Sequence, residues 1–163
     1  MTLKLFGQSI NEQKELTLLG VTFSQSLSFT SHCRSKASKA MQRVRLLRMV
    51  SGQKWGANSH TLLKLYKQYI RPVLEYVNVA ICNVAKSNLV CLQRVQNAAL
   101  RVALRGTRRS KIKDMHDIAQ MQPLTERLRS LRCKAITRYG NSELIKRLEI
   151  QRVLLGGTAD SNP

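Results

Sequence analysis

The chain has 163 residues, of which 43% are hydrophobic and only 5% aromatic, and it carries a net charge of +19. This length predicts one domain or a fragment of a larger protein, with a core built mostly of Leu, Val, Ile and Ala. No apolar run approaches the roughly 18 residues of a membrane-spanning helix, and the first residues do not follow the pattern of a signal peptide. We therefore expect no membrane-spanning segment, and a membrane is not the partner that we predict.

The positive charge is concentrated in one part of the chain. Between Leu16 and Lys113 there are 18 Lys and Arg and a single acid, Glu75, which gives this segment a net charge of +17. Such an excess opposes compaction, and a surface that only keeps a protein soluble is normally mixed in sign. We therefore expect a polyanionic partner, with nucleic acid favoured over an acidic protein or an anionic membrane surface.

Residues 1–27 are predicted to form a short β-ribbon. Residues 2–6 alternate in polarity and residues 16–23 are apolar and β-branched, so we expect two strands that pair with each other. Gly20 lies in the second strand, where a missing side chain lets another backbone or a ligand approach closely. A two-stranded ribbon is marginally stable alone and must pack on helices or on a part of a larger protein.

A long helix is predicted between a cap at Ser28, Thr30 or Ser31 and about Val50. Apolar residues recur there every three or four positions and define an inward face, made of Ala37, Ala40, Met41, Val44 and Leu47. Basic residues fill the remaining faces and include Lys36, Lys39, Arg43 and Arg45. Because these charges are all of one sign, we expect this helix to contact phosphates.

A loop with Trp55 follows. We expect its indole to anchor the loop to the core, with stacking on a nucleic-acid base as the alternative. Asn58 or Ser59 is predicted to cap the next helix. Its apolar face consists of Leu62, Leu65, Tyr66, Tyr69 and Ile70. Pro72 is expected to kink or end this helix, and residues 73–84 to be the most buried segment.

Ser87 or Asn88 is predicted to cap a further helix that Gly106 ends. Its inward face is Leu89, Leu92, Val95, Ala99 and Val102, and a second face carries Arg94, Arg101 and Arg105. A basic loop follows, with Arg108, Arg109, Lys111 and Lys113. The planar fork of arginine can bond two phosphate oxygens at once, so this stripe and loop are candidate phosphate contacts.

The C-terminal third is predicted to contain three more helices. Residues 114–121 form a short one, and a longer one opens at Pro123. The apolar face of the longer helix is Leu124, Leu128, Leu131 and Ala135. A last helix covers residues 142–155 and closes a helical region of residues 28–155. Residues 156–163 are small and polar, so we expect a disordered tail.

The sequence shows no pattern for metal binding or catalysis. The four cysteines form no Cys-x-x-Cys pair and the three histidines are scattered, so we expect reduced thiols and no metal site. Nucleotidyl transfer with two metal ions needs closely placed carboxylates. Asp114 and Asp117 are only three residues apart, but we interpret them as the solvated first turn of a helix. No catalytic residue and no cofactor are therefore predicted for this chain.

Three segments resemble a known family. Residues 70–76 read IRPVLEY and residues 92–101 read LQRVQNAALR, after LLGVTFSQSLSFTSHCRSKASKA at residues 18–40. In this order and spacing they resemble the region that follows the catalytic palm in reverse transcriptases of non-LTR retrotransposons, of the LINE and Jockey kind. The chain departs from the family pattern at Ser24, where Asp is usual, and at Val77, where Gly is usual. The catalytic Tyr-x-Asp-Asp motif does not occur.

The resemblance implies a mainly α, thumb-like helical bundle preceded by the β-ribbon. It implies a primer-grip-like turn at Leu19, Gly20 and Val21. It also implies that the helices hold an RNA–DNA hybrid or duplex DNA by its phosphates. The candidate contacts are Lys36, Lys39, Arg43, Arg94, Arg101, Arg105, Arg108, Arg109, Lys111 and Lys113. The family is an RNA-directed DNA polymerase, but this chain lacks the catalytic aspartates and is expected to be inactive alone.

Two alternatives stay open at this point. The chain can be part of a longer, active reverse transcriptase with palm and fingers elsewhere, or a basic interaction module derived from a decayed element. The sequence leaves open whether the reading frame is expressed, whether the location is nuclear or cytoplasmic, and the oligomeric state.

Overall fold

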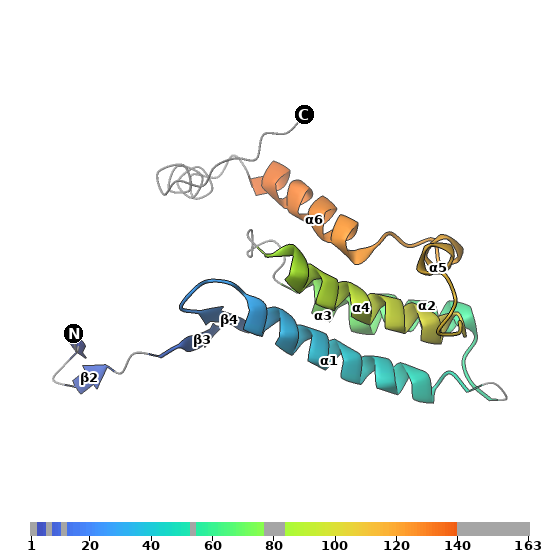
Figure 1. Cartoon of the computed structure of the whole chain (residues 1–163), viewed down its shortest axis with the longest axis horizontal. Helices are drawn as coiled ribbons and strands as arrows, with labels where there is room; N and C mark the ends of the chain where they lie inside the picture. Colours follow the sequence, from blue (N-terminus) through green and yellow to red (C-terminus); the bar gives the residue numbers. More distant parts are fainter. Residues whose placement is uncertain (1–2, 6–7, 11–12, 53–54, 77–83, 140–163) are drawn as a thin grey trace.

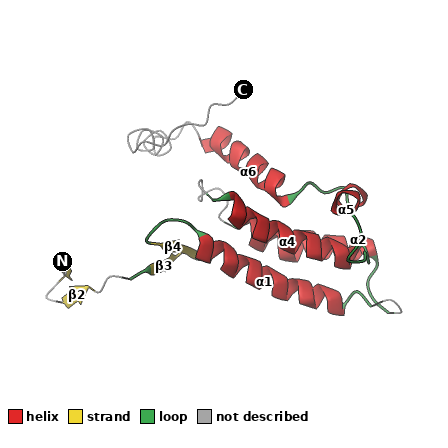
Figure 2. Ribbon diagram, viewed as in Figure 1, coloured by secondary structure: helices red, strands yellow, loops and turns green. Residues whose placement is uncertain are grey.

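The computed structural model of the chain describes residues 3–5, 8–10, 13–52, 55–76 and 84–139. Helices make up most of this part, and the strands are confined to its N-terminal end (Figure 2). The predicted fold class, mainly α with a short N-terminal β structure, is confirmed. The segment 77–83, the helix predicted at 142–155 and the tail 156–163 lie outside the described residues.

The N-terminal strands form two separate hairpins instead of one ribbon. Strand β1 (Leu3–Leu5) pairs with β2 (Gln8–Ile10), and β3 (Glu15–Leu18) pairs with β4 (Val21–Ser24), both antiparallel. The expectation that residues 2–6 pair with residues 16–23 is therefore wrong. The second segment folds back on itself because Leu19 and Gly20 both adopt positive φ, 48° and 74°, as the tightest hairpin turns require.

Helix α1 (Thr30–Met49) begins without a side-chain cap, at a Phe29 with a φ of 53°. The predicted caps at Ser28, Thr30 and Ser31 are wrong because other elements engage this segment. The Ser31 hydroxyl donates to Glu15 Oε2 over 3.1 Å, and the Asn88 amide donates to Ser28 O and Thr30 Oγ1. The inward face is confirmed: Ala40, Val44 and Leu47 are buried, and Ala37 and Met41 pack against them.

Three short helical segments follow in one run: α2 (Ser59–Leu65), η1 (Tyr66–Ile70) and α3 (Arg71–Glu75). The cap at Asn58 is confirmed, since its Oδ1 accepts from Thr61 N over 2.8 Å. The predicted apolar face is confirmed at three of its five residues, and the observed buried face is more regular. It is Leu62, Tyr66, Ile70 and Leu74, at a spacing of four residues, whereas Leu65 and Tyr69 are exposed.

Pro72 does not end this run. The segment η1 is a π-helical turn, in which the backbone N–H of Arg71 donates to Tyr66 O, five residues back. A proline inside an α-helix clashes with the carbonyl group four residues before it. The wider turn accommodates Pro72, and helical backbone continues to Glu75. Of the two predicted outcomes, an end of the helix at Pro72 is therefore wrong, whereas the interruption of the α-helix directly before Pro72 agrees with the predicted kink.

Helix α4 (Lys86–Ala103) lies along α1, and the two form the centre of the fold (Figure 1). Neither Ser87 nor Asn88 caps α4, because its N-cap residue is Ala85. Asn88 is buried and bonds the start of α1 instead. The inward face is confirmed, with Leu92, Val95 and Ala99 buried and Leu89 and Val102 packed against the core.

Helices α5 (Ile112–Ile118) and α6 (Leu124–Tyr139) complete the described fold. The first begins two residues earlier than predicted, so Lys113 lies on a helix and not in a loop. Leu124 and Leu128 of α6 are buried in the core that α1, α3 and α4 share. Glu75 ties α3 to this helix: Arg127 bonds both carboxylate oxygens, and Arg71 Nε lies 3.3 Å from Oε1.

Candidate nucleic-acid interface

The C-terminal ends of α1 and α4 border an open surface cleft lined by arginines. Arg101, Arg105 and Arg108, three of the predicted phosphate contacts, meet there with Arg48 from α1. Ser51 and Gly106 also line this cleft of about 370 Å³, hereafter the arginine cleft. Four arginine residues, a serine and a glycine thus border one open space, into which a phosphate group can fit.

The charge of the arginine cleft is not neutralised by its lining. None of the described residues that line it is acidic. The Nε atom of Arg101 is buried and has no hydrogen-bond partner within the described part of the chain. Arg48 and Arg101 belong to the last turns of their helices, where the partial negative charge of the helix end favours cations. An anion in this cleft would accept charge-assisted hydrogen bonds from guanidinium groups to which the described lining offers no acidic partner.

The backbone at the end of α4 sets the position of Arg105. Gly106 N donates to Arg101 O over 2.8 Å and Arg105 N donates to Val102 O over 3.3 Å, which is the Schellman arrangement. The residue with left-handed backbone is Arg105, with a φ of 54°, and not Gly106 as the sequence suggested. Its Nη2 atom then reaches Gly52 O at 3.3 Å and Ala57 O at 3.5 Å.

The predicted contacts on α1 are partly engaged inside the protein. The Lys36 ammonium lies 4.2 Å from the centre of the Tyr76 ring, and the Arg43 guanidinium 4.4 Å from that of Tyr69. Arg43 also donates to Tyr69 O. Burial, and next the charge of Lys39, lower the pKa of the Lys36 amine. Lys39 is exposed, so it is the residue of this group that faces solvent most openly.

The turn between β3 and β4 holds the three primer-grip-like residues. Leu19 is 84% exposed at the tip, and Val21 is buried. The close approach predicted at Gly20 is made by Tyr76 of the same chain: a Cβ atom on Gly20 would lie 3.3 Å from the tyrosine oxygen. The Tyr76 hydroxyl donates to Leu19 O over 2.8 Å. The turn is thus held against the end of α3 with its leucine facing solvent.

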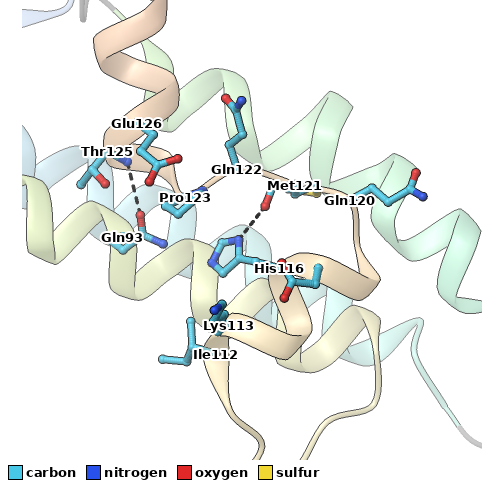
Figure 3. Close-up of a pocket in the computed structure, with 11 residues that line it drawn as sticks. Gln93, Ile112, Lys113, His116, Gln120, Met121, Gln122, Pro123, Thr125 and Glu126 are labelled. Carbon is cyan, nitrogen blue, oxygen red and sulfur yellow. Dashed lines mark hydrogen bonds between the residues drawn. The ribbon is translucent and has the colours of Figure 1, made fainter.

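Lys113 lines a different cleft, between α4, α5 and the start of α6 (Figure 3). A network of polar side chains joins the helices here. His116 Nδ1 lies 2.9 Å from Met121 O, and Gln93 Oε1 accepts from Thr125 N over 3.3 Å (Figure 3). Gln93 thereby holds the start of α6 to α4, and His116 holds α5 to α4 through its Nε2 atom, which lies 3.3 Å from Asn97 Oδ1. The remaining predicted contacts, Arg94, Arg109 and Lys111, are exposed.

Sequence reasoning missed one residue of the arginine cleft, Arg48, and misplaced a residue near it, Trp55. Arg48 was not singled out, because only the packing of α1 on α4 brings it to Arg101; its place in the last helical turn was the one available signal. Trp55 was expected to anchor the loop in the core, and this is wrong, since its side chain is 77% exposed. The alternative, stacking on a base, is thereby left open.

Comparison with known proteins gives no relative: no protein-family model, no curated protein and no solved structure matches the chain. Within the described ranges, no three His, Cys, Asp or Glu side chains are grouped to hold a metal ion. No helix in those ranges is long and apolar enough to cross a membrane.

Proposed function

We propose that this chain binds nucleic acid through backbone phosphates, as a thumb-like part of a non-LTR retrotransposon reverse transcriptase. The observation that carries the proposal is the arginine cleft, where Arg48, Arg101, Arg105 and Arg108 converge without an acid in the described lining. The planar guanidinium group of arginine matches the geometry of phosphate oxygens. A phosphate of a nucleic-acid strand supplies this charge, and its tetrahedral oxygens suit several arginines at once.

The charge outside the cleft supports a polyanion as partner. Arg94, Arg109 and Lys111 are exposed on α4 and on the loop that leaves it, and Arg94 lies two helical turns from Arg101, about 10 Å along the axis. Contacts from these residues to further phosphates would extend the site along a strand. An RNA–DNA hybrid or duplex DNA is the proposed ligand. The chain is proposed to act without catalytic residues of its own, and the exposed turn at Leu19 to contact the primer strand.

A salt titration of binding tests this proposal. Fluorescence anisotropy is measured with an RNA–DNA hybrid, duplex DNA and single strands of several sequences. Each phosphate contact contributes roughly 0.7 to 0.9 to the slope of log affinity against log salt. The double variant Arg101→Ala with Arg108→Ala should lower this slope by about 1.5 and weaken all sequences alike.

The matched control is Lys64→Ala with Arg129→Ala. It removes the same charge from exposed positions outside the proposed interface, so the slope should change much less. If both double variants lower the slope equally, the arginine cleft is not the site. If no nucleic acid binds at low salt but an acidic polypeptide does, the partner class is wrong.

A further inference from the structure

The single tryptophan of the chain lies on the surface beside the arginine cleft. Trp55 is 77% exposed, which is costly for so large an apolar group unless it serves an interaction. One side of its indole lies against Gly52: a Cβ atom there would be 3.0 Å from Cε2 and 3.1 Å from Nε1. The indole ring thus packs against Gly52 on one side, and the rest of the ring is open to solvent.

Backbone contacts join the described residues on either side of the Trp55 loop. Gly56 N donates to Gly52 O and Ala57 N donates to Val50 O, both over 2.9 Å. A side chain at Gly56 is excluded, because its Cβ atom would lie 2.3 Å from the backbone of Gly52. Arg105 Nη2 also donates to Gly52 O and Ala57 O. The ring is therefore carried by a loop held to the end of α4.

The tryptophan and the arginine cleft share neighbours. Gly52, which seats the indole, directly follows Ser51, and Ser51 lines the cleft. Arg105 lines the cleft and bonds the carbonyl group of Gly52. A flat apolar ring and a cluster of guanidinium groups thus lie next to each other, an arrangement that matches the base and the phosphate of one nucleotide.

We infer that this place is a subsite for one unpaired nucleotide, with its base stacked on Trp55 and its phosphate in the arginine cleft. Bases inside a duplex stack on each other and do not offer a free face, so the subsite takes a single-stranded overhang next to the duplex. This inference rests on the proposed function and deepens it. Leu46 and Met49 are also exposed at the end of α1 and would suit a protein partner, but the adjacent arginine cleft favours a nucleotide.

Intrinsic fluorescence gives a direct test, because Trp55 is the only tryptophan. The chain is titrated with three probes: a blunt RNA–DNA hybrid, the same hybrid with a short oligothymidine overhang, and the same overhang built of abasic nucleotides. The base-bearing overhang should quench the fluorescence, and the blunt and abasic probes should not. Trp55→Ala should weaken binding of the base-bearing overhang roughly five-fold or more and leave the blunt hybrid unchanged. Trp55→Phe should recover part of the loss.

The result separates this inference from the proposed function. Equal quenching by the abasic and base-bearing overhangs, or an unchanged affinity of Trp55→Ala for the base-bearing overhang, overturns the subsite. Salt-dependent binding of the blunt hybrid would then still support the proposed function. If the wild-type chain binds none of the probes, both proposals fail. Since Trp55 is exposed, its variants should keep the helical circular-dichroism spectrum and melting curve, which are measured first.

Discussion

The hydroxyl of Tyr76 donates a hydrogen bond to Leu19 O over 2.8 Å and so connects two residues 57 positions apart in the chain. This contact holds the β3–β4 turn to the end of α3. The Tyr76 ring also lies under the Lys36 ammonium. Tyr76, at the end of α3, therefore contacts both the hairpin and α1.

Tyr76→Phe should loosen the hairpin without unfolding the helices. The substitution removes the hydroxyl and keeps the ring, and a hydrogen bond of this kind contributes about 0.5–1.5 kcal/mol. The loss should be at the low end, since water can replace the donor at the exposed Leu19 carbonyl. Urea unfolding measures it, and hydrogen exchange should show faster exchange at the ladder of β3 and β4. Exchange unchanged in these strands contradicts the assigned role.

Leu62→Ala and Leu65→Ala form a matched pair in α2. Leu62 is fully buried, and Leu65 is 37% exposed. A buried leucine cut to alanine costs about 2–5 kcal/mol, so Leu62→Ala should unfold the domain at a much lower temperature, and Leu65→Ala should have a small effect. Thermal melting by circular dichroism compares them. Similar melting temperatures of the two variants would indicate that Leu65 is buried as well, as periodicity alone suggested.

Glu75→Gln should weaken the docking of α6. Its carboxylate is shared by Arg71 and Arg127, and hydrogen bonds to charged groups contribute about 1.5–3 kcal/mol. Solvent reaches both arginines, so screening reduces this and we expect about 1–2 kcal/mol. The difference between wild type and variant should shrink in high salt. Glu126→Gln, at an exposed site on α6, is the control. A salt-independent difference would argue against an ionic contact.

His32 should make the stability depend on pH. Its Nδ1 accepts from Thr22 N over 3.2 Å, so protonation of this atom breaks a contact between α1 and β4. Burial, and next the charge of Lys36, lower the pKa of the imidazole below 6.5. The pKa of His32 is therefore lower in the folded chain than in the unfolded chain. At a pH between these two values the unfolded chain binds more protons than the folded one, so stability falls as the pH drops below 6.5. His32→Gln should flatten this slope in urea unfolding, and the exposed His60→Gln should not.

Periodicity predicted the helices because each buries one face. Ala40, Val44 and Leu47 follow the helical repeat, and the structure buries all three. Caps were harder to predict, because a short polar side chain can bond its own helix or a neighbouring one. Asn58 caps its own helix, whereas Asn88 reaches across to α1. Which of the two occurs depends on the tertiary neighbour, and no local pattern reports it.

The candidate site was also predictable only in part. Arg101, Arg105 and Arg108 are close in the chain, so their spacing alone grouped them. Arg48 joins them only because α1 packs along α4 with both C-terminal ends together. Trp55 is a large aromatic residue, which composition assigns to the core, and its exposure became visible only with the geometry of its loop.

The π turn ahead of Pro72 has a consequence for chain length. Leu62 and Leu74 are twelve residues apart, which in a uniform α-helix would separate them by about 120° around the axis. The wider turn absorbs this rotation and keeps both on the buried face. The run from α2 to α3 thus contains one residue more than a plain helix needs.

A chain shorter by one exposed residue here, such as Gln68, would keep the buried face in register. It would then place the Pro72 ring against the carbonyl group of an ordinary helical turn. A deletion here should therefore be tolerated only together with replacement of the proline.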